Sequence, residues 1–325
     1  MKVSIVTLPF RKNFLIKPVY DAIFAQTYKD LEVIAVLNDS TDGTKEILTK
    51  NYPSIKIIEP GANLFFAKGM NLGIQNSTGE FIQLVNDDLL LEPNYIEEML
   101  KVFDDPKVAA AAGKILRYDF QKNQKLNIID TTGITISSSG RAKDRGQLEA
   151  DSGQYDNQKE VFGVSGAGPM YRKSALEKVR FEQEYFDEDF VMYWEDVDLS
   201  WRFNNAGYKN IYVPTATAYH GRTAGQSEGG YLHLWKFIKH HKKLNHQVLK
   251  WNYKNHILMY IKNAKHIWHP AFVLRELAML GYIVVFETST LKVIPELFRQ
   301  IPKILKKRSI DKKKKPGRMS YPSFS

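Results

Sequence analysis

Two adjacent carboxylates follow a short apolar run, where the chain reads Asn86-Asp87-Asp88 directly after Phe81–Val85. Paired carboxylates at the end of a buried strand cost free energy unless their charge is compensated. A hard divalent cation would compensate it through oxygen ligands, and could bridge two phosphates and neutralise a departing diphosphate. The alternative is an acidic turn that caps the next segment, and this motif alone does not decide between the two.

A second acidic motif, Glu195-Asp196-Val197-Asp198, lies further along the chain. In a helix, Glu195, Asp198 and Arg202 share one face, which would form a salt-linked surface with acids near the helix N-terminus. Asp196 points about 100° away from Glu195. It can therefore face a pocket and act as a general base towards a hydroxyl group. The plain salt-linked helix remains the alternative.

His220 is the only histidine among the first 230 residues. A single histidine is more often a satisfied polar residue than a metal ligand. A cation already held by Asp88 would reverse that expectation, because neutral imidazole is a common metal ligand. The sequence therefore offers Asp88 and His220 as candidate ligands.

Two further polar segments could contact a ligand. The first, Asn38–Gly43, predicts a turn and a helix cap, and its place after a strand also allows contact with a nucleoside. The second runs from Asn63 to Gly73, and its small residues allow close backbone approach. Asn63 and Asn71 could hydrogen-bond a ligand there, although ordinary helix packing explains the segment by itself.

The elements that must position these residues alternate between strands and helices. This alternation predicts an α/β, Rossmann-like, doubly wound and mostly parallel sheet, in which ligands bind beyond the carboxyl ends of the strands. Residues 116–160 are polar and weakly periodic, which predicts loops, short strands and a lid. The expected strands are Lys2–Leu8, Glu32–Leu37, Ile55–Glu59, Phe81–Val85 and Val108–Ile115, and the expected helices are Phe14–Gln26, Lys45–Tyr52, Ala67–Gln75 and Tyr95–Phe103.

Charge divides the chain of 325 residues into unlike parts. Residues 231–325 carry 20 basic and 4 acidic residues, whereas the whole chain has a net charge of +10. We therefore expect one domain at 1–228, a basic helical region at 229–310 after a hinge at Gly229-Gly230, and a disordered tail at 311–325. The absence of cysteine excludes disulfides, thiolate zinc sites and cysteine nucleophiles.

Aromatic and basic residues interleave in the helical region. Helical spacing from Leu234 to His241 and from Trp251 to Tyr260 predicts amphipathic helices. Such helices suit an anionic membrane surface, while nucleic acid is the less favoured anionic partner. Segment 271–286 is apolar apart from Arg275 and Glu276, so it could bury in the protein, enter lipid or mediate homo-oligomerisation.

Taken in order, these motifs resemble glycosyltransferase family 2, the inverting sugar transferases of GT-A fold, and within it the rhamnosyltransferase-like branch. The resemblance covers roughly residues 2–225. It rests on the order and spacing of the first strand and of the segments Asn38–Gly43, Asn63–Ile74, Asn86–Asp88, Gly166–Gly168 and Glu195–Arg202, followed by His220.

The resemblance implies residue roles. Asp88 corresponds to the last acid of a metal-binding Asp-x-Asp motif, with Asn86 in place of the first acid, and His220 would complete the shell of Mg²⁺ or Mn²⁺. Asp196 corresponds to the general base of the Glu195-Asp196 pair. The residues expected to bind the donor or its nucleotide are Thr7, Asn38, Asp39, Asn63, Lys68, Asn71, Asn86 and Asp87.

Three positions depart from the family pattern. Leu37 stands where the family often has Asp, Phe65 replaces a usual glycine, and Leu8-Pro9-Phe10 replaces a Tyr-Asn-type turn. These changes bear on donor identity more than on the class of reaction.

The expected function is metal-dependent, inverting transfer of a sugar from a nucleoside-diphosphate sugar, either dTDP-rhamnose or a UDP-sugar. The expected acceptor is a glycan or lipid-linked glycan in surface polysaccharide synthesis, and the expected location is cytoplasmic, on the inner face of the cytoplasmic membrane. The alternatives are an inactive sugar- or nucleotide-binding scaffold and a nucleic-acid-binding protein. A nucleotidyltransferase is disfavoured, because Thr7–Arg11 does not resemble a glycine-rich phosphate loop.

Overall fold

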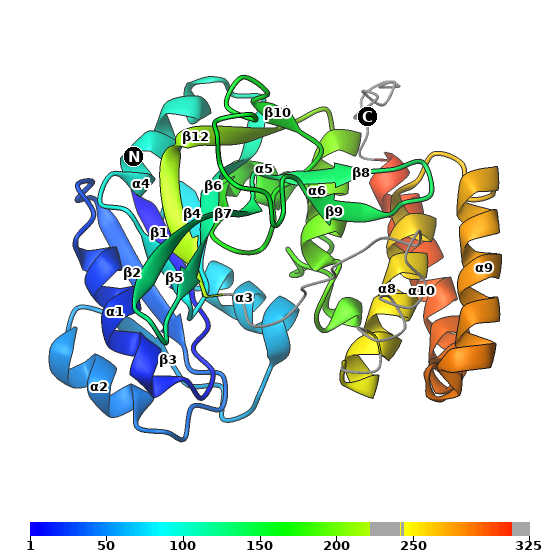
Figure 1. Cartoon of the computed structure of the whole chain (residues 1–325), viewed down its shortest axis with the longest axis horizontal. Helices are drawn as coiled ribbons and strands as arrows, with labels where there is room; N and C mark the ends of the chain where they lie inside the picture. The colour runs from blue at the N-terminus through cyan, green and yellow to red at the C-terminus, as the bar shows by residue number, and fades with distance from the viewer. Residues whose placement is uncertain (222–240, 242–243, 314–325) are drawn as a thin grey trace.

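The computed structural model describes residues 1–221, 241 and 244–313. The hinge predicted at Gly229-Gly230 and the helical spacing that begins at Leu234 lie outside these described residues. Figure 1 shows a twisted sheet with helices on both faces and a group of helices at one end of the molecule.

A ten-stranded sheet forms the centre, and the five predicted strands all run in the same direction within it. Its strands are β1 (Val3–Thr7), β2 (Leu31–Val36), β3 (Lys56–Ile58), β4 (Phe81–Val85), β5 (Leu89–Leu91), β6 (Val108–Asp119), β7 (Gln124–Thr131), β10 (Glu160–Val161), β11 (Met170–Arg172) and β12 (Lys209–His220). The order is β10-β12-β6-β11-β4-β1-β2-β3, with β5 paired to β12 and β7 to β6. Strands β3, β2, β1 and β4 run parallel, which confirms the doubly wound α/β prediction.

Helices cover both faces of this sheet. The helices that precede the C-terminal group are α1 (Asn13–Phe24), α2 (Thr44–Asn51), α3 (Phe65–Gln75), α4 (Tyr95–Leu100), α5 (Lys173–Val179) and α6 (Glu195–Asn205), with short 3₁₀ turns at Lys101–Asp104 and Glu188–Phe190. One core joins α1, α2 and α4 to the sheet, and a second joins α3, α5 and α6 to its other face. Because strand side chains alternate, Val3 and Ile5 of β1 enter the first core and Val6 enters the second.

The polar stretch 116–160 is more regular than predicted. β6 continues to Asp119 and forms a hairpin with β7, and β8 (Ile134–Ile136) pairs with β9 (Ala142–Asp144) as a separate small sheet. Much of β7 is exposed, so its sequence lacks the apolar run of a strand that is covered on both faces. That exposure is why periodicity missed an eight-residue strand.

The C-terminal helices pack against the catalytic part. They are α8 (His246–Asn263), α9 (Pro270–Phe286) and α10 (Ile294–Lys313), with a 3₁₀ segment at Thr288–Val293 between the last two. A third core joins Val197 and Trp201 of α6 to Leu258 of α8 and Ile304 of α10. Residues 244–313 therefore share a core with α6, and α10 continues three residues into the tail predicted to be disordered.

Helix α3 approaches β1 so closely that Gly73 is required there. An added Cβ would lie 2.3 Å from Cγ1 of Val6. We expect Gly73→Ala to lower the free energy of unfolding by about 1–3 kcal/mol, because the buried backbone must shift. Urea denaturation measures this. Gly281→Ala is the matched control: nothing lies within 4 Å of that position in α9, and alanine favours a helix by about 1 kcal/mol. Equal effects at both positions would contradict the packing argument.

Candidate active site

Asp88 and His220 lie in direct contact beyond the end of β4. Antiparallel pairing of β5 with β12 sets Leu89 opposite His220, which brings Asp88 beside the imidazole. Oδ1 of Asp88 is 2.9 Å from Nε2 of His220, and Oδ2 of Asp130 is 2.8 Å from Nδ1 of the same ring. Arg117 pairs with Asp130 from behind at 2.8 Å. The structure thus forms a buried relay of alternating charge that ends at Asp88.

The charges in this relay shift the pKa values of both Asp88 and His220. Burial alone would raise the pKa of Asp88, but His220 and Lys12 outweigh it and lower that pKa to about 2. Burial would likewise lower the pKa of His220, yet hydrogen bonds with Asp130 and Asp88 raise it to about 9. At neutral pH the imidazole therefore carries a proton between two carboxylates.

Lys12, which sequence reasoning did not single out, contacts both acids of the Asn86–Asp88 motif. Its ammonium lies 2.9 Å from Oδ1 of Asp87 and 3.3 Å from Oδ2 of Asp88. Burial raises the pKa of Asp87, and the Lys12 charge opposes that rise. The structure hence supplies a cation to the paired carboxylates, which is the compensation that the motif requires.

Asp130 and Arg117 were also absent from the predicted site. Both belong to the weakly periodic region, where only the short apolar pair Ile128-Ile129 precedes Asp130. Their role becomes visible only through the pairing of β6 with β7 and of β6 with β12.

Asp196 lies in the first turn of α6 and is partly exposed. Its Oδ2 accepts a hydrogen bond from the Gly166 amide at 2.9 Å, and its Oδ1 accepts one from the Val197 amide at 2.8 Å. Glu195 is buried, and burial together with the neighbouring Asp196 charge raises the pKa of Glu195 well above its usual value. Glu195 therefore holds its proton more tightly than an exposed glutamate does, and the neighbouring Asp196 charge contributes to that.

One short loop connects the two acidic motifs. Gly166 donates to Asp196, while the carbonyls of Gly168 and Pro169 accept hydrogen bonds from the side chain of Gln83 and the amide of Leu84 at the end of β4. A Cβ on Gly168 would lie 2.6 Å from the side chain of Leu89, the residue after Asp88. The Gly166–Gly168 loop is thus in contact with both candidate catalytic regions.

The segment before α6 is strained. Val191, Tyr193 and Trp194 have φ values of 63°, 72° and 73°, in the left-handed region that non-glycine residues seldom adopt. Asn255 of α8 holds this turn: its Nδ2 lies 2.7 to 3.0 Å from the carbonyl oxygens of Phe190, Met192 and Tyr193. A C-terminal helix therefore fixes the entry into the helix that carries Asp196.

Buried ion pairs reinforce that link. Lys262 of α8 contacts Asp187 at 2.6 Å and Asp198 at 2.9 Å, and all three side chains are fully buried. Arg202 also pairs with Asp198, and Lys307 of α10 contacts Asp187 at 2.5 Å. Asp198 and Arg202 thus form the predicted salt-linked face of α6, but that face is in the interior and is completed by cations from residues 244–313.

The predicted donor-binding residues fall into two groups. Asn38, Asp39 and Asn63 lie in loops after β2 and β3; Asn38 accepts from the Leu64 amide at 2.6 Å, and Asp39 pairs with Arg11. Asn63 accepts from the Phe65 amide, Lys68 is exposed on α3, and Asn86 is half-buried before Asp87. Donor or nucleotide binding by these residues stays a prediction.

Thr7 and Asn71 are occupied by the protein itself. Both hydrogens and both lone pairs of the Asn71 amide are used, in bonds with Tyr185, Phe186 and Glu188. The Thr7 hydroxyl is buried against Tyr20. This geometry favours a structural role for Thr7 and Asn71 over the predicted contact with a nucleotide.

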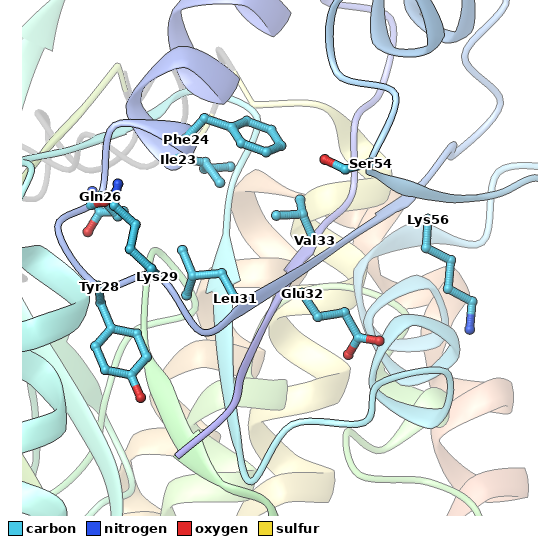
Figure 2. Close-up of a pocket in the computed structure, with 10 residues that line it drawn as sticks. All are labelled: Ile23, Phe24, Gln26, Tyr28, Lys29, Leu31, Glu32, Val33, Ser54 and Lys56. Carbon is cyan, nitrogen blue, oxygen red and sulfur yellow. Dashed lines mark hydrogen bonds between the residues drawn. The ribbon is translucent and has the colours of Figure 1, made fainter.

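A separate pocket of about 390 Å³ lies at the amino end of β2 (Figure 2). It is lined by Ile23, Phe24, Gln26, Tyr28, Lys29, Leu31, Glu32, Val33, Ser54 and Lys56. Because Asn38 follows the carboxyl end of the same strand, this pocket is at the opposite edge of the sheet, and none of the predicted site residues lines it.

Asp88 and His220 fit a divalent cation by their chemistry. Carboxylate oxygen and imidazole nitrogen are both suitable ligands, provided that the cation displaces the proton between Nε2 of His220 and Asp88. Asp130 behind the ring is the outer partner that orients a ligating histidine. Within the described residues, no group of three or more acidic or histidine side chains is arranged as a metal site. Two protein ligands suffice where substrate phosphates provide the others.

Solved structures that resemble the whole fold include GT-A glycosyltransferases. The structure of S. aureus TarS 1-349 in complex with UDP-GlcNAc matches with a TM-score of 0.56 and 14% identity, covering 97% of this chain and 89% of that one. GalNAc-T7 with UDP, GalNAc and Mn²⁺ matches with a TM-score of 0.55 and 11% identity, covering 85% and 54%. These likenesses confirm the predicted GT-A fold.

The chain belongs to the family described as glycosyl transferase family 2, whose family model matches residues 4–180. It is 26% identical over 245 residues to an N-acetylglucosaminyl-diphospho-decaprenol L-rhamnosyltransferase of Mycobacterium tuberculosis, covering 66% of this chain and 74% of the relative. It is 23% identical over 289 residues to a poly-beta-1,6-N-acetyl-D-glucosamine synthase of Staphylococcus epidermidis, covering 88% and 60%. The predicted resemblance to the rhamnosyltransferase-like branch and the prediction of a glycosyltransferase are confirmed.

The buried ion pairs predict a large and pH-dependent effect of Lys262→Met. This change leaves Asp187 and Asp198 short of a cation, so we expect the free energy of unfolding to fall by about 3–5 kcal/mol at pH 7. Lys262 and Lys307 outweigh burial and hold the pKa of Asp187 well below its usual value. A carboxyl group whose pKa is lower in the folded than in the unfolded state stabilises the fold above the unfolded pKa of about 4. That stabilisation is lost as the pH falls towards the folded pKa. The difference in stability between wild type and Lys262→Met should therefore shrink below about pH 4.

Urea denaturation at a series of pH values measures this difference. Lys303→Met is the matched control, because Lys303 pairs with Asp189 while half of its side chain is exposed. We expect that control to cost about 0–1 kcal/mol. Similar losses for both variants, or a loss from Lys262→Met that grows in acid, would contradict this account.

Proposed function

We propose that this glycosyltransferase moves a sugar from a nucleoside-diphosphate sugar, either dTDP-rhamnose or a UDP-sugar, to a hydroxyl group with inversion. The observation that carries this proposal is the Gly166–Gly168 loop, which hydrogen-bonds to Asp196 at one end and packs at the other end against Leu89, the residue after Asp88. In such a transfer, the base must reach the acceptor hydroxyl while the acid lies at the diphosphate of the same donor. A loop that touches both regions is consistent with that requirement.

Asp196 takes the proton of the acceptor hydroxyl in this mechanism. As the proton leaves, the oxygen attacks the anomeric carbon, and the bond from that carbon to the diphosphate oxygen breaks on the opposite face. The amides of Gly166 and Val197 orient the carboxylate, and protonated Glu195 adds no second negative charge beside it. Inversion follows from a single displacement.

The diphosphate end of the donor lies at Asp88 in this proposal. Mg²⁺ or Mn²⁺, held by Asp88 and His220, would supply positive charge to the leaving diphosphate. Asp130 orients the imidazole, and Lys12 balances Asp87 and Asp88 when no other cation does. Asn38, Asp39 and Asn63 are proposed to contact the nucleoside, with Lys68 and Asn86 towards the phosphates.

The proposed acceptor is a glycan or lipid-linked glycan of a cell-surface polysaccharide. The names of the relatives support this class, since one is a rhamnosyltransferase for a diphospho-decaprenol acceptor and another makes a poly-N-acetylglucosamine. A water-soluble donor and a lipid-linked acceptor meet at a membrane, so we further propose that the enzyme works in the cytoplasm at the inner face of the cytoplasmic membrane.

Asp196→Asn and Glu195→Gln should separate the two acids of the pair. Asparagine cannot accept the proton, so we expect turnover to fall by about 10²–10⁴-fold with donor binding retained. Glutamine resembles the protonated Glu195, so its effect should stay within about threefold. Single-turnover rates with a matched donor titration measure both. Near-normal turnover of a folded Asp196→Asn protein would remove the assigned base.

Thermal shifts with nucleotides should depend on the cation. We expect UDP or dTDP compounds to raise the melting temperature more with Mn²⁺ or Mg²⁺ than without a cation, because a ligand stabilises the state that it binds. Asp88→Asn should abolish the cation-dependent part. Asp39→Asn is the comparison variant, and it should weaken nucleotide binding with or without a cation. A full shift after exhaustive chelation would exclude the metal role, and no shift with any nucleotide would favour a scaffold.

A further inference from the structure

Helix α9 presents its apolar residues outward and its charged residues inward. Arg275 and Glu276 pair with each other, and Glu276 also lies 3.0 Å from His256 of α8. Their side chains are only 16% and 14% exposed. An ordinary surface helix has the opposite arrangement. The outward surface of α9 is formed by Leu274, Leu277, Ala278, Leu280, Gly281, Val284, Val285 and Phe286.

This surface, which we call the α9 face, is apolar along the whole helix. Leu277 and Val285 are 62% and 67% exposed. Trp268 lies just before the helix and is 79% exposed, in the position of an interfacial aromatic residue. Helix α9 is the outermost of the three C-terminal helices in Figure 1, so no other described element covers this face. A contiguous apolar patch of this kind marks a site of interaction.

Positive charge accompanies the apolar surface on α10. Phe298 and Leu305 are exposed two turns apart, and Arg299 and Lys306 each follow one of them on the exposed side. Helix α10 has seven basic and two acidic residues, and residues 231–325 have a net charge of +16. A symmetric dimer through this region would bring like charges together. An anionic lipid surface complements both the apolar and the basic residues.

We propose that the α9 face and the exposed residues of α10 form a membrane-docking surface that enters the interfacial layer of an anionic bilayer. No single described helix is long and apolar enough to cross a membrane; Pro270–Phe286 and Thr288–Ile310 meet that test only together, with a bend of 118° between them. Apolar side chains insert among the acyl chains, while Arg299 and Lys306 contact the lipid phosphates.

This inference rests on the described surface and not on the transferase chemistry. Docking would also hold the enzyme at the membrane surface where a lipid-linked acceptor lies, and this part of the inference rests on the proposed function. Because α8 and α10 hold the turn before α6 and the buried acids behind it, the docking helices belong to the same packed unit as Asp196.

Vesicle flotation of the full chain tests the proposal, with phosphatidylcholine vesicles that contain or lack phosphatidylglycerol. We expect binding to the anionic vesicles at low salt. The triple change Leu274→Ser, Leu277→Ser and Val284→Ser should weaken it by at least about tenfold, because less apolar surface leaves water. The pair Arg299→Gln and Lys306→Gln should weaken it by about tenfold and reduce its salt dependence.

The matched control is Phe14→Ser. Phe14 is 70% exposed, and its helix α1 lies at the other end of the molecule from α9. This control should leave vesicle binding unchanged. All variants should keep the wild-type melting temperature and rate of donor hydrolysis, which separates a docking failure from a failure of the catalytic proposal. Brominated lipid should quench the tryptophan fluorescence of the vesicle-bound protein. Loss of that quenching in Trp268→Phe would locate the Trp268 side chain in the bilayer.

Two outcomes would overturn the proposal. The first is a wild-type protein that does not float with anionic vesicles at low salt, or a triple variant that binds them as well as wild type. The second is a dimer by light scattering that the triple change converts to a monomer without any vesicle binding. That result would assign the α9 face to a second copy of the chain.

Discussion

The buried carboxylates of Asp187 and Asp198 constrain the rest of this molecule. Two fully buried negative charges are tolerated only beside cations, and Lys262 and Lys307 come from helices that begin more than forty residues later in the chain. The catalytic helix α6 and the C-terminal helices are thereby joined by charge as well as by their shared apolar core. Removing either partner would leave an uncompensated charge in the interior, so the two regions form one structural unit.

The same linkage explains how a strained turn persists before the candidate base. Left-handed φ values at Val191, Tyr193 and Trp194 each cost on the order of 1 kcal/mol, and a turn in isolation would relax. Asn255 binds three carbonyls of this turn, and the Ala67 amide of α3 donates to the Val191 carbonyl at 3.3 Å. Helices from both sides thus hold the entry to α6, and Asp196 is directed towards Gly166.

The sequence predicted the parallel sheet well, because β1, β2 and β4 are short apolar runs that are mostly buried. The partly exposed edge strand β3 was predicted as well. It also predicted the proximity of Asp88 and His220, which the structure places 2.9 Å apart. Lys12, Asp130 and Asn255 escaped prediction because each acts through a contact between segments that are distant in the sequence. A local pattern can indicate the strand or helix that holds such a residue, but it does not identify the contact partner. Asn71 shows the converse limit, because its side-chain amide makes four hydrogen bonds within the protein at a place where the sequence predicted contact with the donor.

Phe65 shows how the C-terminal helices reach the donor side. The family usually has glycine there, and Phe65 keeps a glycine-like φ of 55°. An aromatic residue in that conformation costs on the order of 1–2 kcal/mol. Its ring lies edge-to-face on Trp251 of α8 at 5.3 Å, a contact that contributes about 0.5–1.5 kcal/mol beyond the buried area. The substitution therefore depends on α8 for its stability, and the same helix that fixes the turn before Asp196 shapes the wall beside Asn63. A donor bound beside Asn63, as proposed, would therefore lie next to Phe65, a residue that is held in place by the C-terminal region, outside the matched segment 4–180.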